Sequence, residues 1–222
     1  MRSWKMDEEL KKNVLKTGTS IVGIVCKDGV VLAADRKTTA GTIAVNKNTK
    51  KITKINEYLI FAGTGMASDV EMLRKLVIAE LKLKELRSKR RPSVKEGANL
   101  IGMIAYNNIR QMSMLPFIAG TLVAGYNNDG SFELYTIEPA GTVQKVEDYD
   151  ANLSSGMPFI LGLLESKYDQ NITIKQGINL AVDCIKASTQ RDTGSGFGID
   201  VFTVTIQGIS QVVDQKIKPS YV

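Results

Sequence analysis

Strand-like and helix-like patterns occur in separate runs along this chain, and their order is the strongest constraint on its fold. The order is strands, two helices, strands, two helices and closing strands. The expected strands are 21–25, 30–34, 42–46, 58–62, 117–126, 132–137, 199–206 and 210–213. The expected helices are 68–91, 94–112, one that begins near Pro158, and 174–185. Segregated runs favour an α+β fold over the alternating pattern of a parallel sheet.

Local signals indicate how these segments join. Asp28-Gly29, between the first two strands, is typical of a β-hairpin. We expect 42–46 to pair with 58–62. Ser93 followed by Glu96 is a capping-box pattern that starts the second helix. Two antiparallel sheets between helix layers would bury every apolar face, so we expect a four-layer αββα sandwich.

Length and composition fit one globular domain. The chain has 222 residues, of which 43% are hydrophobic, and it contains no linker or internal repeat. No apolar run is long enough to cross a bilayer. The first 18 residues mix both signs of charge and lack the apolar stretch of a secretory signal, which predicts a cytoplasmic location. Cys26 and Cys184 lie in apolar patterns without CxxC spacing, so we interpret both as core residues.

Charge and the absence of histidine narrow the function. The net charge of +6 is spread along the chain, with one basic cluster at 87–91 just before Pro92. A nucleic-acid-binding domain is therefore a competing hypothesis, which would require salt-sensitive affinity for RNA or DNA; no recognised module supports it. The sequence has no histidine, which excludes Ser-His-Asp and Cys-His hydrolases and His-ligated zinc.

Four short motifs place hydroxyl, carboxylate and ammonium groups at the ends of strands. They are KTGTS at 16–20, AADRKTT at 33–39, KKI at 50–52 with Ala62-Gly63 downstream, and QRDTGSG at 190–196. Taken singly, each has an ordinary structural explanation, such as a strand entry, a turn-forming Asp or solvated lysines. Asp-Thr-Gly also occurs in aspartic proteases, but the single copy here weakens that interpretation.

Taken together, the motifs resemble the β subunits of archaeal-type 20S proteasomes, which are N-terminal nucleophile hydrolases. The resemblance runs from Gly18 to about residue 206 and includes TGTSIVG, DGVVLAADRKTTAG, KKI, SGMPFILGLLE and QRDTGSGFGIDV. It implies the αββα fold of that family and a threonine peptidase that needs no cofactor and no metal. An N-terminal threonine mechanism also agrees with a chain that has no histidine.

The resemblance implies a role for each matching residue. Thr19 matches the nucleophile, and Gly18 matches the residue before the self-cleavage point. The other implied roles are Asp35 and Lys51 beside the threonine hydroxyl, Asp192, Ser195 and Ser155 around the amine, Gly63 as oxyanion donor, and Thr39 as a binder of the peptide backbone. The family's pocket for the side chain before the cut corresponds to Thr38, Thr49, Thr53, Phe61 and Gly65 or Met66. Because none of these is charged, we expect cleavage after apolar residues.

Elementary chemistry supports these implied roles. A threonine hydroxyl is a poor nucleophile until a base takes its proton. A free α-amine has a pKa of about 7.7–8.0, near working pH, and on Thr19 it would belong to the nucleophile itself. Lys51 would favour the alkoxide and Asp35 would keep Lys51 oriented.

The resemblance also implies domains and partners. Residues 1–18 would be a propeptide removed by self-cleavage, and 19–222 the catalytic domain. The expected partners are other β subunits in a seven-membered ring, an α-subunit ring, a regulatory ATPase and unfolded polypeptide substrates, with no nucleic acid and no membrane. The alternative is a non-catalytic structural β subunit of the same ring.

Overall fold

The computed structural model of the chain describes residues 18–217, which form two large antiparallel sheets. The first has the strand order β10-β1-β2-β11-β12. Its strands are β1 (Ile21–Cys26), β2 (Gly29–Asp35), β10 (Tyr149–Asp150), β11 (Gly198–Thr205) and β12 (Gly208–Lys216). The second has the order β5-β6-β7-β8-β9. Its strands are β5 (Ile52–Lys54), β6 (Leu59–Gly65), β7 (Ala119–Tyr126), β8 (Phe132–Ile137) and β9 (Val143–Val146).

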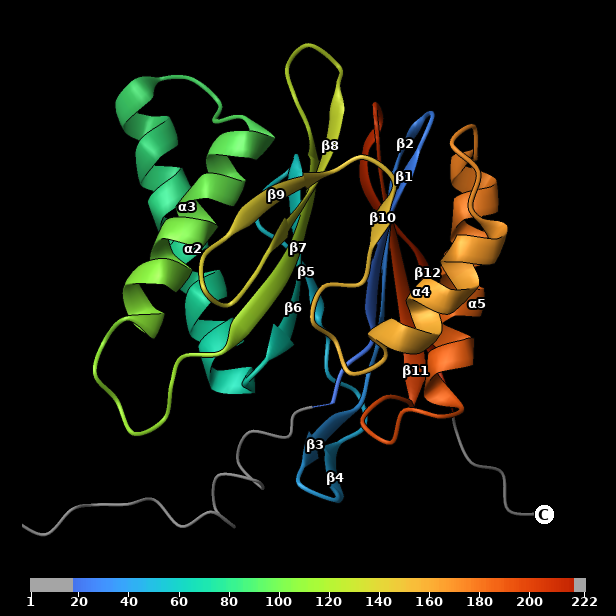
Figure 1. Cartoon of the computed structure of the whole chain (residues 1–222). Coiled ribbons are helices and arrows are strands. Elements are labelled where there is room, and N and C mark those ends of the chain that lie inside the picture. Colours follow the sequence, from blue (N-terminus) through green and yellow to red (C-terminus); the bar gives the residue numbers. More distant parts are fainter. Residues whose placement is uncertain (1–17, 218–222) are drawn as a thin grey trace, which may run out of the picture.

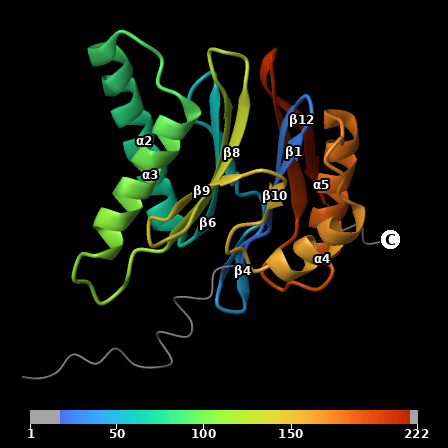
Figure 2. The same ribbon diagram turned by 45° about the horizontal axis from the view of Figure 1, so that its top comes forward.

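Helices cover the outer face of each sheet. Helices α2 (Ala67–Ser88) and α3 (Val94–Ile109) lie against the second sheet, and α4 (Met157–Lys167) and α5 (Ile174–Thr189) lie against the first. Figure 1 shows these layers edge-on, and the turned view of Figure 2 keeps the same order. The α+β fold with its αββα layers is therefore confirmed. Among the described residues, no helix is long and apolar enough to cross a membrane.

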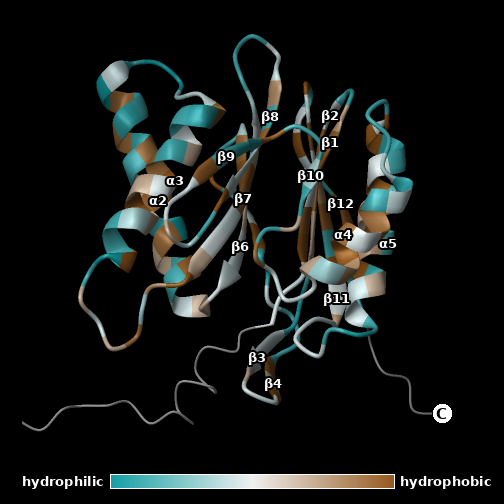
Figure 3. Ribbon diagram, viewed as in Figure 1, coloured by the Kyte–Doolittle hydropathy of each residue, from teal (hydrophilic) through white to brown (hydrophobic). Residues whose placement is uncertain are grey.

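Three apolar clusters hold the layers together. One joins α2 and α3 to the second sheet around Leu73 and Val123, and another joins α4 and α5 to the first sheet around Ile160 and Cys184. The third lies between the two sheets, around Leu32 and Leu122. In Figure 3 the hydrophobic colour gathers on the strands and on the helix faces that meet them. Burial on both faces explains why the central strands read as almost continuous apolar runs.

Most expected elements are confirmed, with small differences at their ends. The capping box at Ser93 is present, and Pro158 lies in the first turn of α4 as expected. Helix α2 ends at Ser88, so the basic cluster at 87–91 lies mostly in the turn after it. Helix α3 ends at Ile109, three residues before the expected Met112.

The expected pairing of 42–46 with 58–62 is wrong. Strand β4 (Ile43–Asn46) instead pairs with β3 (Thr38–Ala40) in a small two-stranded hairpin. Strand β6 pairs with β5 and β7. Strand β4 is mostly exposed although its first three residues are apolar, and no local sequence signal distinguishes this hairpin from a strand of the main sheet. The hairpin matters because it projects beyond the sandwich at the end where β1 begins (Figure 1).

Several donors hold the carboxylate of Glu96 at the start of α3. Glu96 accepts from the backbone N–H of Ser93 at 2.9 Å and pairs with Arg90 at 2.7 Å and Lys84 at 3.0 Å. The hydrogen bonds from Arg90 hold the pKa of this carboxyl below its usual range. Its stabilising effect is thus present above the unfolded pKa of about 4.3 and is lost as pH falls.

Glu96→Gln keeps the capping acceptor but removes the charge. We expect it to lower the free energy of unfolding by about 0.5–1 kcal/mol at pH 7, with the difference shrinking between pH 5 and pH 3. Urea unfolding of both proteins across this range measures it. A difference that stays constant with pH would show that the ion pairs contribute nothing.

Candidate active site

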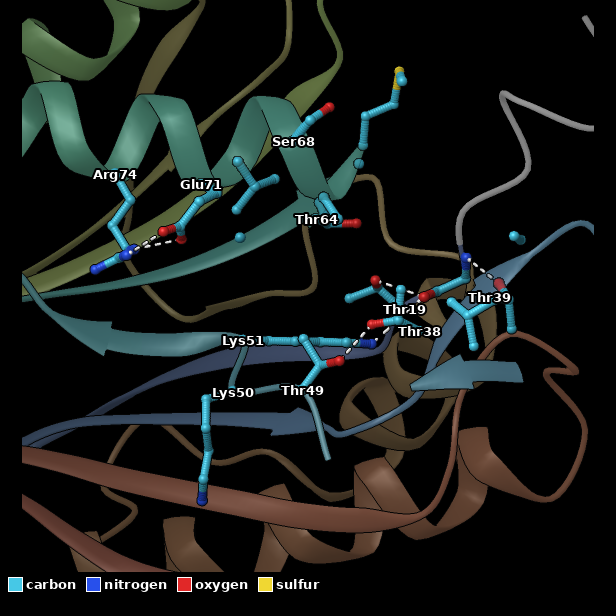
Figure 4. A pocket seen from close by; sticks show the side chains of 18 of the residues that line it. Thr19, Thr38, Thr39, Thr49, Lys50, Lys51, Thr64, Ser68, Glu71 and Arg74 are labelled. Carbon is cyan, nitrogen blue, oxygen red and sulfur yellow. Dashed lines mark hydrogen bonds and ion pairs between the residues drawn. The ribbon is translucent and has the colours of Figure 1, made fainter. Parts of the chain in front are cut away.

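A large cavity opens beside Gly18 and Thr19. Its volume is about 1030 Å³, and the β3–β4 hairpin, the ends of β5 and β6 and the start of α2 surround it. Figure 4 shows Thr19, Thr38, Thr39 and Lys51 on one side and the side chains of α2 on the other. Its lining includes Gly18, Thr19, Thr38, Thr39, Thr49, Lys51, Thr53, Phe61, Gly63, Gly65 and Met66.

Thr19 lies at the edge of this cavity, just before β1, with 5% of its surface exposed. Its hydroxyl donates to the carbonyl oxygen of Gly18 at 2.7 Å. The N–H of Thr19 donates to Ser155 Oγ at 2.9 Å, and the N–H of Gly18 donates to Thr39 Oγ1 at 3.2 Å. The peptide bond between Gly18 and Thr19 is thus held on both sides by side-chain hydroxyls.

A buried ion pair lies next to this peptide bond. Lys51 Nζ is 2.6 Å from Asp35 Oδ1 and 3.5 Å from the carbonyl oxygen of Gly18. Asp35 is fully buried and also accepts from the backbone N–H groups of Ser20 (2.8 Å) and Gly196 (2.9 Å). Burial lowers the pKa of the Lys51 ammonium, while the charge of Asp35 opposes that shift.

Strand register explains why these groups meet. Asp35 is the last residue of β2, and its N–H donates to the carbonyl of Ser20 at 3.0 Å, which fixes it beside the start of β1. Lys51 directly precedes β5, whose Ile52 pairs with Ala62 of β6. The two charges come from different sheets, so their contact joins the sheets at this end of the sandwich.

A second carboxylate lies on the amide side of Thr19. Asp192 Oδ2 accepts from Ser155 Oγ at 2.6 Å and from Ser195 Oγ at 2.5 Å, and Asp192 Oδ1 accepts from the N–H of Gly194 at 3.0 Å. Ser155 therefore links Asp192 to the nitrogen of Thr19. The structure brings all three of the residues that we expected near the amine into one hydrogen-bonded group.

Gly63 lines the cavity, but its N–H already has a partner. It donates to the carbonyl of Lys51 at 3.1 Å, as an extension of the β5–β6 ladder. The role of Gly63 as an oxyanion donor stays a prediction, and it requires this N–H to be shared with a second acceptor. A Cβ at Gly63 would overlap Val70 Cγ1 of α2, so the close approach of the helix requires glycine.

The six residues that we expected to form a pocket all line the cavity. None of the six is charged, but the cavity extends beyond them, and Lys50, Glu71 and Arg74 also line it. Glu71 and Arg74 are joined at 2.6 Å, and Lys75 lies 3.2 Å from the same carboxylate. Figure 4 shows this pair across the cavity from Thr19. Helical spacing puts Glu71 and Arg74 on one face of α2, but the sequence does not show that this face borders the cavity.

A second ionic network, which the sequence did not lead us to expect, lies behind the first. Arg36 is fully buried and bonds Asp200 through Nε at 2.9 Å. Lys50 Nζ reaches the same carboxylate at 2.8 Å. The N–H of Thr49 donates to the carbonyl of Arg36 at 3.0 Å. Because Arg36 follows Asp35 and Lys50 precedes Lys51, this network holds the two segments that carry the first ion pair.

Two buried serines also escaped the sequence analysis. Ser20 and Ser188 bond each other and lie against Ser195. The available signal was Ser188 itself, a polar residue that continues the buried stripe of Ala181, Cys184 and Ile185 on α5.

The cysteines are buried as expected, and burial raises the pKa of each thiol to about 12, so neither is a nucleophile at neutral pH. Residues 18–217 contain no group of three or more potential metal ligands.

Comparisons with known proteins agree on one family. Residues 15–204 match the family described as "Proteasome subunit". The "Proteasome subunit beta" of Nanoarchaeum equitans is 38% identical over 87% of this chain and 96% of its own length. "Proteasome subunit beta 2" of Pyrococcus abyssi is 40% identical over 90% of this chain and 93% of its own. "Proteasome subunit beta 1" of Thermococcus kodakarensis is 37% identical over 96% and 98%.

A double mutation tests the close approach at Gly63. Gly63→Ala should lower the free energy of unfolding by about 1–3 kcal/mol, because its methyl group meets Val70. Adding Val70→Ala removes the obstruction. The double variant should therefore lose less free energy of unfolding than the sum of the losses in the two single variants. Strictly additive costs in urea unfolding would mean that the strand and helix move apart freely.

Proposed function

The chain belongs to the proteasome subunit family, and on that premise we propose that it is a catalytic β subunit, a threonine endopeptidase that hydrolyses unfolded polypeptides. We further propose that residues 1–18 are a propeptide and that 19–222 form the catalytic domain. The observation that carries the proposal is the position of the Gly18–Thr19 bond. It lies between the Thr19 hydroxyl, 2.7 Å from the Gly18 oxygen, and the Lys51 ammonium, 3.5 Å from that oxygen.

Self-cleavage follows from this arrangement in two steps. The Thr19 oxygen attacks the carbonyl carbon of Gly18, and negative charge develops on the Gly18 oxygen, within reach of Lys51. The C–N bond then breaks, and the proton given up by the Thr19 hydroxyl passes through a water to the nitrogen of Thr19, while Gly18 stays attached through an ester. Ser155 accepts from the N–H of Thr19 and donates to Asp192, so it holds that nitrogen in place during the transfer. Water hydrolyses the ester, which releases Gly18 as a carboxylate and restores the Thr19 hydroxyl.

The product of self-cleavage has the groups that peptide hydrolysis needs. The new α-amine of Thr19 takes the proton of the hydroxyl as that oxygen attacks a substrate carbonyl. Lys51, held by Asp35 at 2.6 Å, stabilises the negative charge that forms on the Thr19 oxygen as it loses its proton. The amine returns the proton to the departing nitrogen, and water then hydrolyses the ester. We assign Thr39 to the substrate backbone, because its hydroxyl accepts from the Gly18 N–H at 3.2 Å.

A non-catalytic ring subunit is the alternative function. Such a subunit has no need of a threonine, a lysine and a glycine that meet at one peptide bond, and Gly18, Thr19 and Lys51 meet here. This contact favours the catalytic role.

Family membership implies assembly with other proteasome subunits. We propose that the partners are other β subunits in a seven-membered ring, an α-subunit ring and a regulatory ATPase, in the cytoplasm. The exposed apolar side chains of α2 and α3, Met72, Leu76, Leu83, Leu86, Met103 and Tyr106, suit such contacts.

Lysine substitutions test the proposed chemistry. In assembled particles, Lys51→Ala should lower peptide hydrolysis at least about 100-fold, because the developing negative charge loses its main cation. Lys51→Arg should also fail, since a planar guanidinium does not replace a compact ammonium. Lys145→Ala, which removes an exposed lysine of β9, is the control that should keep full activity. Near-normal turnover by either Lys51 variant would refute the proposed mechanism.

Peptides that differ only in the residue before the cut test the cavity. Because Glu71 and Arg74 compensate each other's charge, we expect cleavage after Leu, Tyr or Phe to exceed cleavage after Arg or Glu. Glu71→Gln leaves Arg74 without its partner, so cleavage after Glu should rise several-fold relative to cleavage after Leu. Glu80→Gln, on the exposed face of α2, is the matched control. If Glu71→Gln and Glu80→Gln give the same ratio, this wall does not contact that side chain.

A further inference from the structure

A chain of buried hydroxyl groups leads from helix α5 to the carboxylate beside Thr19. Ser188 Oγ bonds Ser20 Oγ, and Ser20 Oγ lies 2.7 Å from Ser195 Oγ. Ser195 Oγ lies 2.5 Å from Asp192 Oδ2. Ser20 and Ser188 are fully buried and Ser195 is 4% exposed, so water does not compete for these bonds.

Counting hydrogens fixes the direction of this chain. A serine hydroxyl has one hydrogen to donate, and an ionised carboxylate only accepts. Ser195 therefore donates to Asp192, and its oxygen must accept from Ser20. Ser20 has then used its hydrogen, so its oxygen accepts from Ser188. All three donors point toward Asp192, an arrangement in which each bond polarises the next.

The surrounding backbone is built around this chain. A Cβ at Gly156 would overlap the hydroxyl oxygens of both Ser20 and Ser188, so only glycine leaves room for their contact. The carbonyl of Ser188 also accepts from the N–H of Asp192 at 2.8 Å. Ser188 thus holds Asp192 through its backbone and, along the hydroxyl chain, through its side chain.

We propose that Ser188 and Ser20 are positioning residues for proton transfer at Thr19, acting through Ser195 and Asp192. The proposal rests on the proposed peptidase function and deepens it. Asp192 reaches the nitrogen of Thr19 through Ser155, at 2.6 Å and 2.9 Å. The hydrogen bonds of the hydroxyl chain spread the negative charge of Asp192 over several groups. They therefore set how strongly that charge favours the protonated form of the Thr19 amine.

Removing the chain should therefore change the amine. Without Ser20 or Ser188 the bond from Ser195 to Asp192 is less polarised, so the charge of Asp192 draws the proton more strongly and the pKa of the Thr19 amine rises. The other charged groups that face this site are Lys51 from the start of β5, Asp35 at the end of β2, and Lys37, whose ammonium bonds the carbonyl of Thr193 at 2.5 Å. They are unchanged in a serine variant, so a shift reports on the hydroxyl chain.

The test is the pH profile of kcat/KM for a fluorogenic peptide, measured on assembled particles. Because the amine must be neutral to act as base, the acid limb should move to higher pH by about half a unit in Ser188→Ala and by at least as much in Ser20→Ala. Ser20→Thr restores a hydroxyl and should restore the wild-type midpoint. Thr189→Ala, which removes the neighbouring hydroxyl that donates to the Lys186 carbonyl instead, should leave the midpoint unchanged.

The outcomes separate the two proposals. If the wild-type particle hydrolyses the peptide, and the acid-limb midpoint is the same in Ser188→Ala, Ser20→Ala and Thr189→Ala, the positioning role is overturned and the peptidase function stands. A wild-type particle without hydrolysis overturns both. If Ser188→Ala does not assemble, Ser188→Cys, whose thiol is only a weak donor, should show the same shift; a wild-type midpoint in that variant also overturns the positioning role.

Discussion

The ion pair between Lys51 and Asp35 is the contact on which the site depends. It joins the two sheets at one end of the sandwich, where both charges are almost fully removed from water. Burying such a pair is costly unless its remaining bonding positions are filled. Here the backbone N–H groups of Ser20, Lys37 and Gly196 supply those bonds to Asp35. Two apolar side chains would fill this space without the free energy needed to remove two charges from water. The presence of an ion pair beside Thr19 therefore fits a chemical role better than a stabilising one.

The rest of the site is arranged around that pair because side chains of successive residues point in opposite directions. Asp35 and Lys51 face the Gly18–Thr19 bond, while their chain neighbours Arg36 and Lys50 meet Asp200 on the far side. Figure 4 shows Lys51 reaching toward Thr19 and Lys50 pointing away from it. One pair of adjacent segments thus carries both the reactive group and its support. On the opposite side of Thr19, Asp192 and its serines hold the nitrogen. Acid–base groups therefore approach the peptide bond from two sides without a histidine.

Sequence reasoning succeeded where local pattern decides structure. The helix that begins at Ser93 and the hairpin at Asp28-Gly29 follow from capping and turn chemistry, and both are confirmed. The site residues were placed through motif resemblance, and the structure brings Thr19, Lys51 and Asp35 together, although their roles remain predictions. The β3–β4 pairing, the Arg36 network and the Glu71–Arg74 wall were missed. The first two depend on contacts between segments that no spacing or propensity encodes. Glu71 and Arg74 lie one turn apart in α2, but the sequence does not show that this face of the helix borders the cavity.

The intact mass of the chain, measured after assembly with its α-subunit partner, decides whether Thr19 becomes an N-terminal nucleophile by its own chemistry. We expect the wild-type chain to lose residues 1–18 and the Thr19→Ala chain to keep them, because the variant lacks the attacking oxygen. A wild-type chain that stays whole in assembled particles, or a Thr19→Ala chain trimmed at Gly18, would contradict this expectation.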